Sequence, residues 1–470
     1  MRSRGSMLIT CVAVLILGPV LALANGFYTP TVGPRAGAMG GAFIGLADDY
    51  SAVYWNPAGI TQLKGMEMTA TGHDVVSLAS RDGVVRYYGD TEERYALVSL
   101  GATSETANRI APGVFFFTDA GPLRSVFDKV GVAAYTLTEY GSKWGADDVL
   151  NGADFVDHDV SSDFASKRLV GDMQDYESRI KTYVFSPVFA KEVVPGLSVG
   201  LTANIAYSHF TLSDVYMETY VDTVDVPAVE DEYHLYVRPV QLTDDVIGWG
   251  YGATVGVLYR ASRQVSVGMV LRTPMTISYE GVYRARLSGG GSVAESAYTS
   301  DFELKYPMWA GAGFAYRDFL FNGLTMTGDV QWTGWSSIDR IDRNIVWGGG
   351  WTPEELETLA EFETTEFNWE DTVEVGVGFD YRLGRSVSLN LGYRSSPSPV
   401  GDDDYYNFVL PQSSKNVVAA GVNYRQDFWR AAFALEYHAG AERRISQTYD
   451  MDGKHLDDLL IPSLSFTYAF

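Results

Sequence analysis

The sequence predicts an all-β protein, a transmembrane antiparallel β-barrel of about fourteen strands with an N-terminal segment inside the lumen. Three observations predict this fold class. Apolar and polar residues alternate with a period of two along most of the chain, as expected for strands. Beyond the N-terminal region, no unbroken apolar run is long enough to form a spanning helix. The chain also ends in an alternating strand that is closed by Phe470.

Residues 1–24 have the features of an export signal. Arg2 and Arg4 supply a positive N-terminal region, and residues 7–17 form an apolar core. Gly18-Pro19 interrupts that core, and Ala22-Leu23-Ala24 offers a cleavage site made of small residues. We therefore predict that residues 1–24 are a signal peptide and that the mature chain is exported.

The composition excludes several classes of protein. The formal net charge of −24 opposes nucleic-acid binding, because phosphates are neutralised by Lys and Arg. Cys11 is the single cysteine and lies inside the predicted signal, so the mature chain offers neither a disulfide nor a thiol nucleophile. An exported chain that is 46% apolar and has no spanning helix is either a large secreted β protein or an outer-membrane barrel.

The C-terminal strand favours the barrel. In residues 464–470, Leu464, Phe466, Tyr468 and Phe470 fall on one face and the small or polar residues on the other. A terminal phenylalanine is typical of outer-membrane barrels, in which the assembly machinery recognises it; the alternative is an ordinary sandwich strand. The same alternation recurs upstream. A sandwich would bury these apolar faces against each other, whereas a barrel turns them to lipid.

The predicted strands form an even number, which closes a barrel with both chain ends on one side of the membrane. Residues 87–100 are not assigned to a strand. The predicted strands cover residues 65–80, 110–118, 129–141, 175–191, 196–211, 247–261, 264–284, 298–317, 322–337, 367–383, 386–397, 413–425, 429–441 and 457–470.

The connections alternate between short turns that carry Lys or Arg and long segments. Short turns on the periplasmic side and long external loops are the usual arrangement of such barrels. Asp402, Asp403 and Asp404 are better explained as a solvated acidic loop than as a calcium site. The predicted long segments are residues 142–174, 212–246, 285–297, 338–366 and 398–412, and all but 285–297 are strongly acidic.

One long segment contains a helix signature. Thr352-Pro353-Glu354-Glu355 combines an N-cap, a proline at the first helical position and a capping-box glutamate. The partly apolar helix that follows either packs on the barrel rim or contributes to a surface that captures a ligand.

Residues 25–62, which precede the first predicted strand, include the glycine-rich run "GAMGGAFIGLADDYSAVYWNPAGIT" (37–61). A phosphate-binding loop does not fit, because no Gly-Lys-Ser/Thr follows the glycines. The apolar residues of this segment must be buried, and the barrel lumen is the available place. Glycines allow tight folding there, and Asn56-Pro57 can fix a rigid turn before the wall begins.

At this point the chain resembles the FadL/TodX-type outer-membrane transporters of long-chain fatty acids and aromatic hydrocarbons. Gly33 to Ala36, "ADD" (47–49) and "NPAGIT" (56–61) are similar to that family's N-terminal hatch. The wall segments with the same resemblance are "GWGYGATVGVLY" (248–259), "DVQWTGWSS" (329–337), "NWEDTVEVGVGFDYRL" (368–383), "LNLGYRSSPSPV" (389–400), "LPQSSKNVVAAGVNY" (410–424) and "FTYAF" (466–470).

The resemblance implies a fourteen-stranded barrel with a hatch over residues 25–62 and the wall over 63–470. It also implies passive transport, in which a hydrophobic molecule enters the lumen and leaves sideways through a gap in the wall. The implied hatch residues are Arg35, Gly40, Gly41, Asp48, Asp49, Asn56, Pro57 and Ala58.

In the family, a kinked third strand makes the gap, which implies a position near residues 129–141 with Gly131, Tyr140 and Gly141. Members that bind fatty acids place basic side chains near the carboxylate. The corresponding stretches here offer His209, Arg340 and Arg343, although strict alternation turns His209 toward lipid. Fatty acid and neutral hydrocarbon both remain open as ligands.

The expected partners are a hydrophobic small molecule, outer-membrane lipid with lipopolysaccharide, and the barrel-assembly machinery through Phe470. The expected location is the bacterial outer membrane. No enzymatic activity, cofactor, metal or nucleic acid is expected. Two alternatives from other classes are a general porin for polar solutes, which would have an open lumen, and a structural or adhesin barrel whose loops carry the function.

Overall fold

The structure is a computed structural model. It describes residues 26–27, 32–88, 95–104, 109–144, 155–157, 168–169, 176–224, 232–289, 292–346, 363–401, 413–445 and 453–470. The predicted signal peptide, the predicted helix after Thr352 and the acidic triplet at Asp402 lie outside the described residues.

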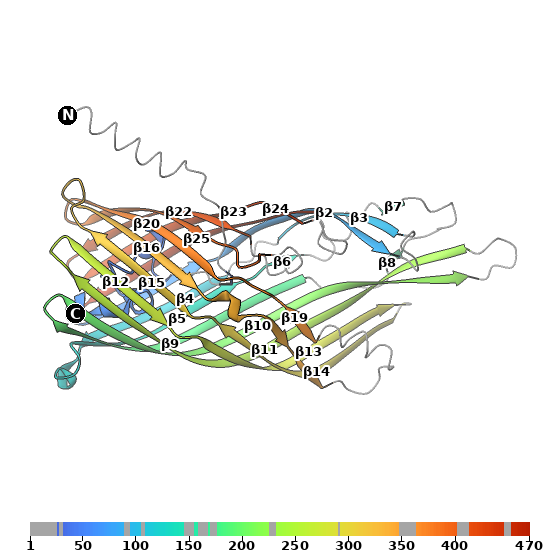
Figure 1. Ribbon diagram of the computed structural model, residues 1–470, viewed down its shortest axis with the longest axis horizontal. Coiled ribbons are helices and arrows are strands. Elements are labelled where there is room, and N and C mark those ends of the chain that lie inside the picture. Colours follow the sequence, from blue (N-terminus) through green and yellow to red (C-terminus); the bar gives the residue numbers. More distant parts are fainter. Residues whose placement is uncertain are drawn as a thin grey trace, which may run out of the picture.

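The wall is a closed antiparallel barrel of 14 strands, as predicted (Figure 1). It closes where β1 pairs with β25, from Glu67 opposite Ala469 to His73 opposite Ser463. The wall strands, some built from two consecutive segments, are β1 (Glu67–Asp74) with β2 (Val76–Tyr88), β3 (Tyr95–Thr103) with β4 (Ile110–Asp119), β5 (Lys129–Tyr140) with β6 (Lys143–Trp144), β9 (Tyr176–Val194), β10 (Leu197–Val224), β11 (Glu232–Arg260), β12 (Val265–Arg272) with β13 (Met275–Gly289), β14 (Ser292–Tyr306) with β15 (Trp309–Tyr316), β16 (Leu324–Thr333) with β18 (Asn344–Val346), β20 (Thr372–Leu383), β21 (Val387–Ser396), β22 (Lys415–Gln426), β23 (Trp429–Gly440) with β24 (Arg443–Ile445), and β25 (Gly453–Ala469).

Smaller elements complete the described structure. β7 (Phe155–Asp157) pairs with β3, and β8 (Arg168–Leu169) pairs with β11. β17 (Arg340–Asp342) and β19 (Thr364–Glu366) form a separate two-stranded ribbon. The 3-10 helix η2 (Gly121–Leu123) lies in the turn before β5, and η3 (Trp335–Ser337) follows β16.

The prediction that residues 212–246 form a long loop is wrong. β10 and β11 continue through most of this segment as one hairpin, with Val224 opposite Glu232 (Figure 1). The segment contains many β-branched and aromatic residues, which favour strands. Its acidic residues favour a loop, but they do not prevent the two strands from pairing. Residues 285–297 were misassigned in the same way, because β13 and β14 pair up to Gly289 and Ser292.

The first two wall strands are also longer than predicted. β2 and β3 form a hairpin in which Tyr88 lies opposite Tyr95, so most of the unassigned stretch 87–100 is strand. The predicted first strand therefore continues from residue 80 to Tyr88, and the second begins at Tyr95 instead of 110.

Alternation fixes which side chains face outward. Trp249, Tyr251 and Val255 are exposed on β11, with 70% of Tyr251 accessible, while Gly250 and Thr254 on the other face are buried. Phe433, Leu435 and Tyr437 repeat this arrangement on β23, and the last strand repeats it to Phe470. An outward apolar band with small and polar residues inside is the pattern of a barrel in lipid.

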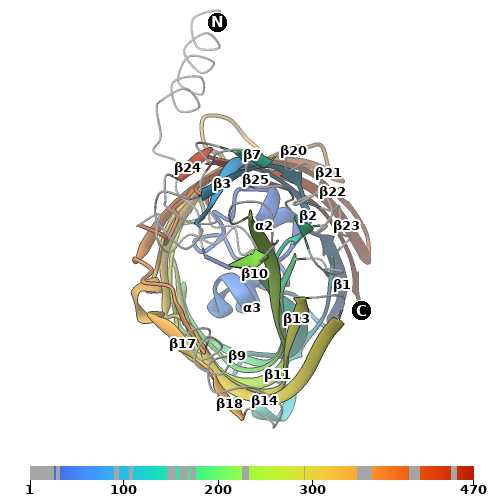
Figure 2. The ribbon, with the colours of Figure 1, turned by 90° about the vertical axis from the view of Figure 1, so that its right-hand side faces the viewer.

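Residues 32–62, called the hatch below, lie inside the barrel (Figure 2). Its elements are the short helices α2 (Pro34–Ala38) and α3 (Ala52–Trp55) and the 3-10 helix η1 (Pro57–Gln62). Met39, Phe43 and Trp55 are fully buried, because the wall encloses the segment on all sides. Within the described part of the chain, no helix is long and apolar enough to cross a membrane.

Candidate transport site

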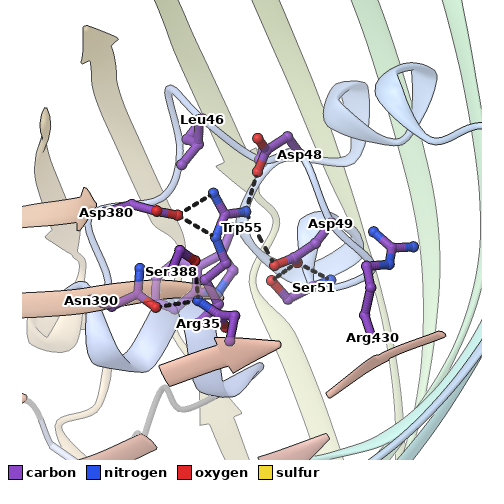
Figure 3. Close-up of polar contacts among 12 residues, drawn as sticks. Arg35, Leu46, Asp48, Asp49, Ser51, Trp55, Asp380, Ser388, Asn390 and Arg430 are labelled. Carbon is purple, nitrogen blue, oxygen red and sulfur yellow. Dashed lines mark hydrogen bonds and ion pairs between the residues drawn. The ribbon is translucent and has the colours of Figure 1, made fainter. Parts of the chain in front are cut away.

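Arg35 is the centre of the ion-pair network that joins the hatch to the wall (Figure 3). Its Nη1 atom lies 2.5 Å from Asp48 Oδ1 and 3.7 Å from Asp49 Oδ2. Its Nε and Nη2 atoms lie 2.9 and 2.8 Å from Asp380 Oδ2 on β20. A planar guanidinium suits this role because its donors point in several fixed directions. The predicted hatch residues Arg35, Asp48 and Asp49 therefore contact each other and the wall.

Burial and neighbouring charges shift the pKa values of Arg35 and Asp49 in opposite directions. Burial lowers the pKa of Arg35, but Asp48, Asp380 and Asp49 raise it, and the net result is a pKa well above its ordinary value. Burial raises the pKa of the Asp49 carboxyl, against the lowering effects of Arg35 and of the hydrogen bonds from Ser51. The charge of Arg35 therefore opposes the effect of burial on the pKa of the Asp49 carboxyl.

Asn56 fastens the other end of the hatch. Its Nδ2 atom donates to the backbone carbonyls of Ile44 and Val257, both at 3.0 Å, and Val257 belongs to β11. Its Oδ1 atom accepts from the Ala58 backbone N–H at 3.2 Å and so caps η1, which begins at Pro57. The predicted triplet Asn56-Pro57-Ala58 is thus a rigid turn that is bonded to the wall.

Wall glycines create the space for this turn. A Cβ atom on Gly256 would lie 2.2 Å from Asn56 Oδ1, and one on Gly268 would lie 2.2 Å from the Ile44 carbonyl oxygen. Only glycine allows such close approach of two backbones. On β21, the hatch backbone at Gly40 meets Gly392 in the same way. The fit between these wall glycines and the hatch has no signal in the local sequence of either segment.

Three polar wall residues that no sequence motif indicated hold the loop around Ile44. Asp329 Oδ2 accepts from the Ile44 N–H at 2.7 Å. Gln331 Nε2 donates to the carbonyl of Gly41 at 3.1 Å, and Ser266 Oγ donates to that of Gly45 at 2.7 Å. The only available signal was an inward carboxylate and amide in "DVQW", which is common in barrel lumens.

The third wall strand separates from the second beyond Tyr135. β5 pairs with β4 only as far as Tyr135 opposite Gly113. Its pairing with β9 then shifts register between Thr136 and Thr138, which marks a β-bulge at Leu137. From Tyr135 to Tyr140 every residue is buried, so the strand no longer alternates between lumen and lipid.

The predicted residues of this strand have distinct positions. Gly131 lies in the regular part, opposite Phe117 of β4. Tyr140 is buried beyond the bulge, and Gly141 has a φ of 142° where a Cβ atom would lie 2.0 Å from the Ser178 carbonyl oxygen. Glycine is therefore required where the chain leaves β5.

Side chains bridge the edge that β5 leaves open on β4. Thr136 Oγ1 donates to the Pro112 carbonyl at 3.1 Å, and Lys181 Nζ donates to the Ile110 carbonyl at 3.1 Å. Lys181 also lies 2.8 Å from the buried carboxylate of Glu139. These contacts replace the missing backbone ladder between β4 and β5. Ile110 itself is 64% exposed on the outer face.

A cavity lies on the lumenal side of this bulge. It is narrow, with room for about one water molecule between the side chains. Arg272 borders it, and the Arg272 guanidinium lies over the rings of Tyr54 and Trp309, 4.3 and 4.7 Å from their centroids. The cavity is lined by Tyr135, Leu137, Val184, Asn204, Gly252, Arg272, Thr273, Met275 and Tyr306.

An aromatic cluster lies on the other side of Tyr306. The ring of Phe27 is 5.1 Å from that of Tyr306, 5.0 Å from that of Trp335 and 5.9 Å from that of Trp369. Phe27 is buried, and it follows closely on the predicted cleavage site after Ala24. These aromatic residues were not predicted to form a cluster, because they lie far apart along the chain and no local sequence pattern shows that they meet.

The three predicted head-group residues are not brought together. His209 is half exposed and faces outward, with its Nε2 atom 2.9 Å from Asp245 Oδ1. Arg340 is exposed and pairs with Asp342 at 2.8 Å. Arg343 is buried and pairs with Asp244 at 2.8 Å. Among the described residues, no group of three or more His, Asp or Glu side chains is placed to hold a metal ion.

The fold and the lumenal segment define a class: an outer-membrane β-barrel whose interior is filled by its own N-terminal chain. The family model for outer membrane protein transport proteins (OMPP1/FadL/TodX) matches residues 15–470. The chain belongs to this family, and it is an outer-membrane protein.

Individual relatives are distant. The chain is 20% identical over 437 residues to NMB0088 of Neisseria meningitidis serogroup B, which is named as an outer membrane protein, with 87% of this chain and 86% of that one covered. A Pseudomonas aeruginosa FadL homologue superposes with a TM-score of 0.69 at 14% identity, covering 95% of this chain and 100% of that one. The Pseudomonas putida toluene transporter TodX gives 0.66 at 15% identity, covering 93% and 98%. These structural likenesses show the fold.

Proposed function

We propose that this protein carries hydrophobic compounds passively across the outer membrane by lateral release. The ligand enters from the outside, passes through the lumen beside the bulge of β5, and leaves between β4 and β5 into the bilayer. Membership of the family of outer membrane transport proteins supports the transport part of this proposal. Long-chain fatty acids and related hydrocarbons are the proposed ligand class, and no catalysis is involved.

The observation that carries this proposal is the separation of β5 from β4 at Tyr135, next to a lumenal cavity. Tyr135 and Leu137 line that cavity, and the neighbouring Ile110 and Val114 are exposed on the outer face. A ligand that leaves here exchanges an apolar lining for lipid without crossing water. It avoids a free-energy cost of about 25 cal/mol for each Å² of apolar surface that water would otherwise cover.

The fixed hatch accounts for the choice of a lateral path. Arg35 and Asn56 bind it to different wall strands, and the residues between them are buried apart from Asp48 and Asp49. An axial path would require these contacts to break, whereas the path through the wall requires side-chain bridges such as those of Thr136 and Lys181 to open. The division into signal peptide 1–24, hatch 25–62 and barrel 63–470 is part of this proposal.

The proposed partners follow from the same surfaces. Outer-membrane lipid with lipopolysaccharide covers the outward apolar band. Phe470 is 67% exposed at the end of the last strand, with its ring 4.9 Å from that of Tyr468, and is the proposed contact for the barrel-assembly machinery.

Uptake by cells that lack their own hydrophobic transporter tests this function. Cells expressing the chain should take up radiolabelled oleate or toluene faster than cells without it, and should take up a small sugar no faster. Deletion of residues 26–58 should add sugar uptake, because the lumen then opens. Sugar uptake by the intact protein, with no gain for oleate or toluene, would contradict the proposal and support a porin.

A further inference from the structure

We infer that the short turns of this barrel form a collar that binds the anionic head groups of phospholipids in the inner leaflet of the outer membrane. The collar covers the turns and the adjoining strand ends, at residues 64–66, 119–129, 191–196, 260–264, 317–323, 382–386 and 425–430. These turns lie at the end of the barrel that carries the C-terminus (Figure 1), which is the periplasmic end in such barrels. The inference goes beyond the proposed transport, because it concerns a surface that the ligand does not use.

The collar carries unpaired positive charge, although the chain as a whole has a formal net charge of −24. Five of its cations are exposed and have no ion pair within the described part of the chain: Lys64, Arg124, Arg263, Arg385 and Arg425. They belong to five different turns, so the positive charge is distributed around the end of the barrel. An anion that contacts them must come from outside the described chain.

Most carboxylates of the collar are already neutralised by its other cations. Three ion pairs do this: Asp119 with Lys129 at 2.6 Å, Glu192 with Arg260 at 3.0 Å, and Asp318 with Arg382 at 3.6 Å. Among the described residues of the collar, Asp128 and Asp427 are the carboxylates without an ion pair. The unpaired cations therefore exceed the unpaired carboxylates, and the collar attracts anions.

Exposed apolar side chains lie beside these cations. Leu123 and Val126 flank Arg124, and 54% of Val126 is accessible. Phe428 lies in the same turn as Arg425 and is 63% accessible. Cations interleaved with exposed apolar side chains are typical of a surface that lies in the membrane interface. Because this apolar surface continues the outward band of the wall, it favours lipid over a soluble acidic protein as the partner.

Tyrosines on the outer wall place the collar at the level of the lipid head groups. Tyr259, Tyr381 and Tyr424 are exposed where their strands approach the turns. Aromatic girdles of this kind mark the boundary between hydrocarbon and water. Arg425 directly follows Tyr424, and Arg263 lies a few residues beyond Tyr259. Long cationic side chains at such positions extend to the interface, where the lipid phosphates lie.

The chemistry of the cations matches a phosphodiester. All but Lys64 of the five are arginines, and a planar guanidinium can bind a phosphate through two parallel hydrogen bonds. A zwitterionic head group carries its own cation, which competes for the same phosphate. An anionic head group such as that of phosphatidylglycerol has no such cation, so the collar should prefer it.

The test compares how spin-labelled phosphatidylglycerol and phosphatidylcholine associate with the purified full-length barrel in phosphatidylcholine bilayers at neutral pH. Electron paramagnetic resonance separates lipids at the protein surface from bulk lipids, because the former move more slowly. Phosphatidylglycerol should associate about two- to fivefold more strongly than phosphatidylcholine at low ionic strength. Raising NaCl to about 1 M should remove this preference, because the Debye length then falls to about 3 Å.

Replacement of the five unpaired cations by glutamine should make the two lipids associate about equally. This variant combines Lys64→Gln, Arg124→Gln, Arg263→Gln, Arg385→Gln and Arg425→Gln. The matched control keeps every charge, with Lys64→Arg and the four arginines changed to lysine, and should retain the preference. A second control, Arg340→Gln with Arg444→Gln, removes exposed cations outside the collar and should also retain it.

An unchanged preference in the glutamine variant would overturn the inference, since cations outside the collar would then bind the lipid. If that variant does not fold, the wild type decides. A preference for phosphatidylglycerol that high salt removes would support the collar. Equal association of the two lipids with the wild type at low ionic strength would overturn it and leave an acidic soluble protein as the partner to test.

Discussion

Joining β4 to β5 across their separated edges should abolish uptake of hydrophobic compounds. Pro112→Cys and Thr136→Cys place two thiols at positions that are already in contact, since Thr136 Oγ1 lies 3.1 Å from the Pro112 carbonyl oxygen. The only cysteine of the chain, Cys11, lies in the predicted signal peptide, so these thiols are unique in the mature protein. A short, reducible thiol cross-linker then closes the gap.

The expected result is at least a tenfold lower rate of oleate or toluene uptake after cross-linking, a barrier change of about 1.4 kcal/mol or more. Reduction should restore the rate. The matched control is Val422→Cys with Phe433→Cys, a directly opposed, outward pair on β22 and β23. Full uptake through the cross-linked barrel would contradict lateral release at this gap.

Arg35→Gln should release the hatch at neutral pH. The substitution leaves Asp48, Asp49 and Asp380 without their shared cation in a part-buried network, which costs more than the roughly 0–1 kcal/mol of an exposed pair. Planar-bilayer recordings should therefore show a larger ion conductance than for the wild type. Arg382→Gln breaks an exposed pair with Asp318, which is worth about 0–1 kcal/mol, and should leave the conductance unchanged.

Acidification should reverse the larger ion conductance expected for Arg35→Gln. The pKa of Asp49 is raised by burial even with Arg35 present, and loss of the cation removes an opposing effect. A carboxyl whose folded-state pKa is raised stabilises the folded state below its ordinary pKa of about 3.9 and loses that contribution as the pH rises. The conductance of Arg35→Gln should thus fall as the pH is lowered from neutral toward about 4. A variant with wild-type conductance throughout this range would show that the network does not hold the hatch.

The barrel could be predicted from the sequence because its signal is local. Each wall strand carries its own period of two, as in residues 249–259, and lipid enforces that period along the whole outer face. The extent of the external hairpins could not be predicted in the same way. Beyond the membrane the outer face of a strand meets water, so apolar and polar residues alternate less clearly there. For this reason the predicted strands at β10 and β11 are shorter than the observed ones.

The hatch could be predicted as a buried segment but its contacts could not. Glycines and apolar residues in 37–61 require burial, whereas the pairing of Arg35 with Asp380 joins residues that are 345 positions apart. Likewise, nothing in "GWGYGATVGVLY" shows that Gly256 faces Asn56. Such matches depend on the three-dimensional path of the hatch and not on any local pattern.

The residues predicted to bind the ligand head group also depend on the fold and not on the local sequence. His209, Arg340 and Arg343 were selected by their places along the chain, yet their side chains point to different surroundings. Arg272, which borders the lumenal cavity, had no sequence signal, because one inward arginine at the end of a strand is ordinary in a barrel. Its neighbours Tyr54 and Trp309 become visible only in the fold.

The route of the ligand is tested most directly by photolabelling. A decanoate analogue with a diazirine at its chain end would be bound to the purified barrel in lipid, illuminated, and its adducts mapped by mass spectrometry. Lateral release predicts adducts on residues 110–114 and 132–137, the two edges of the gap. Adducts on η1, at residues 57–62 of the hatch, with none at the gap would show that the ligand passes axially and would contradict the account.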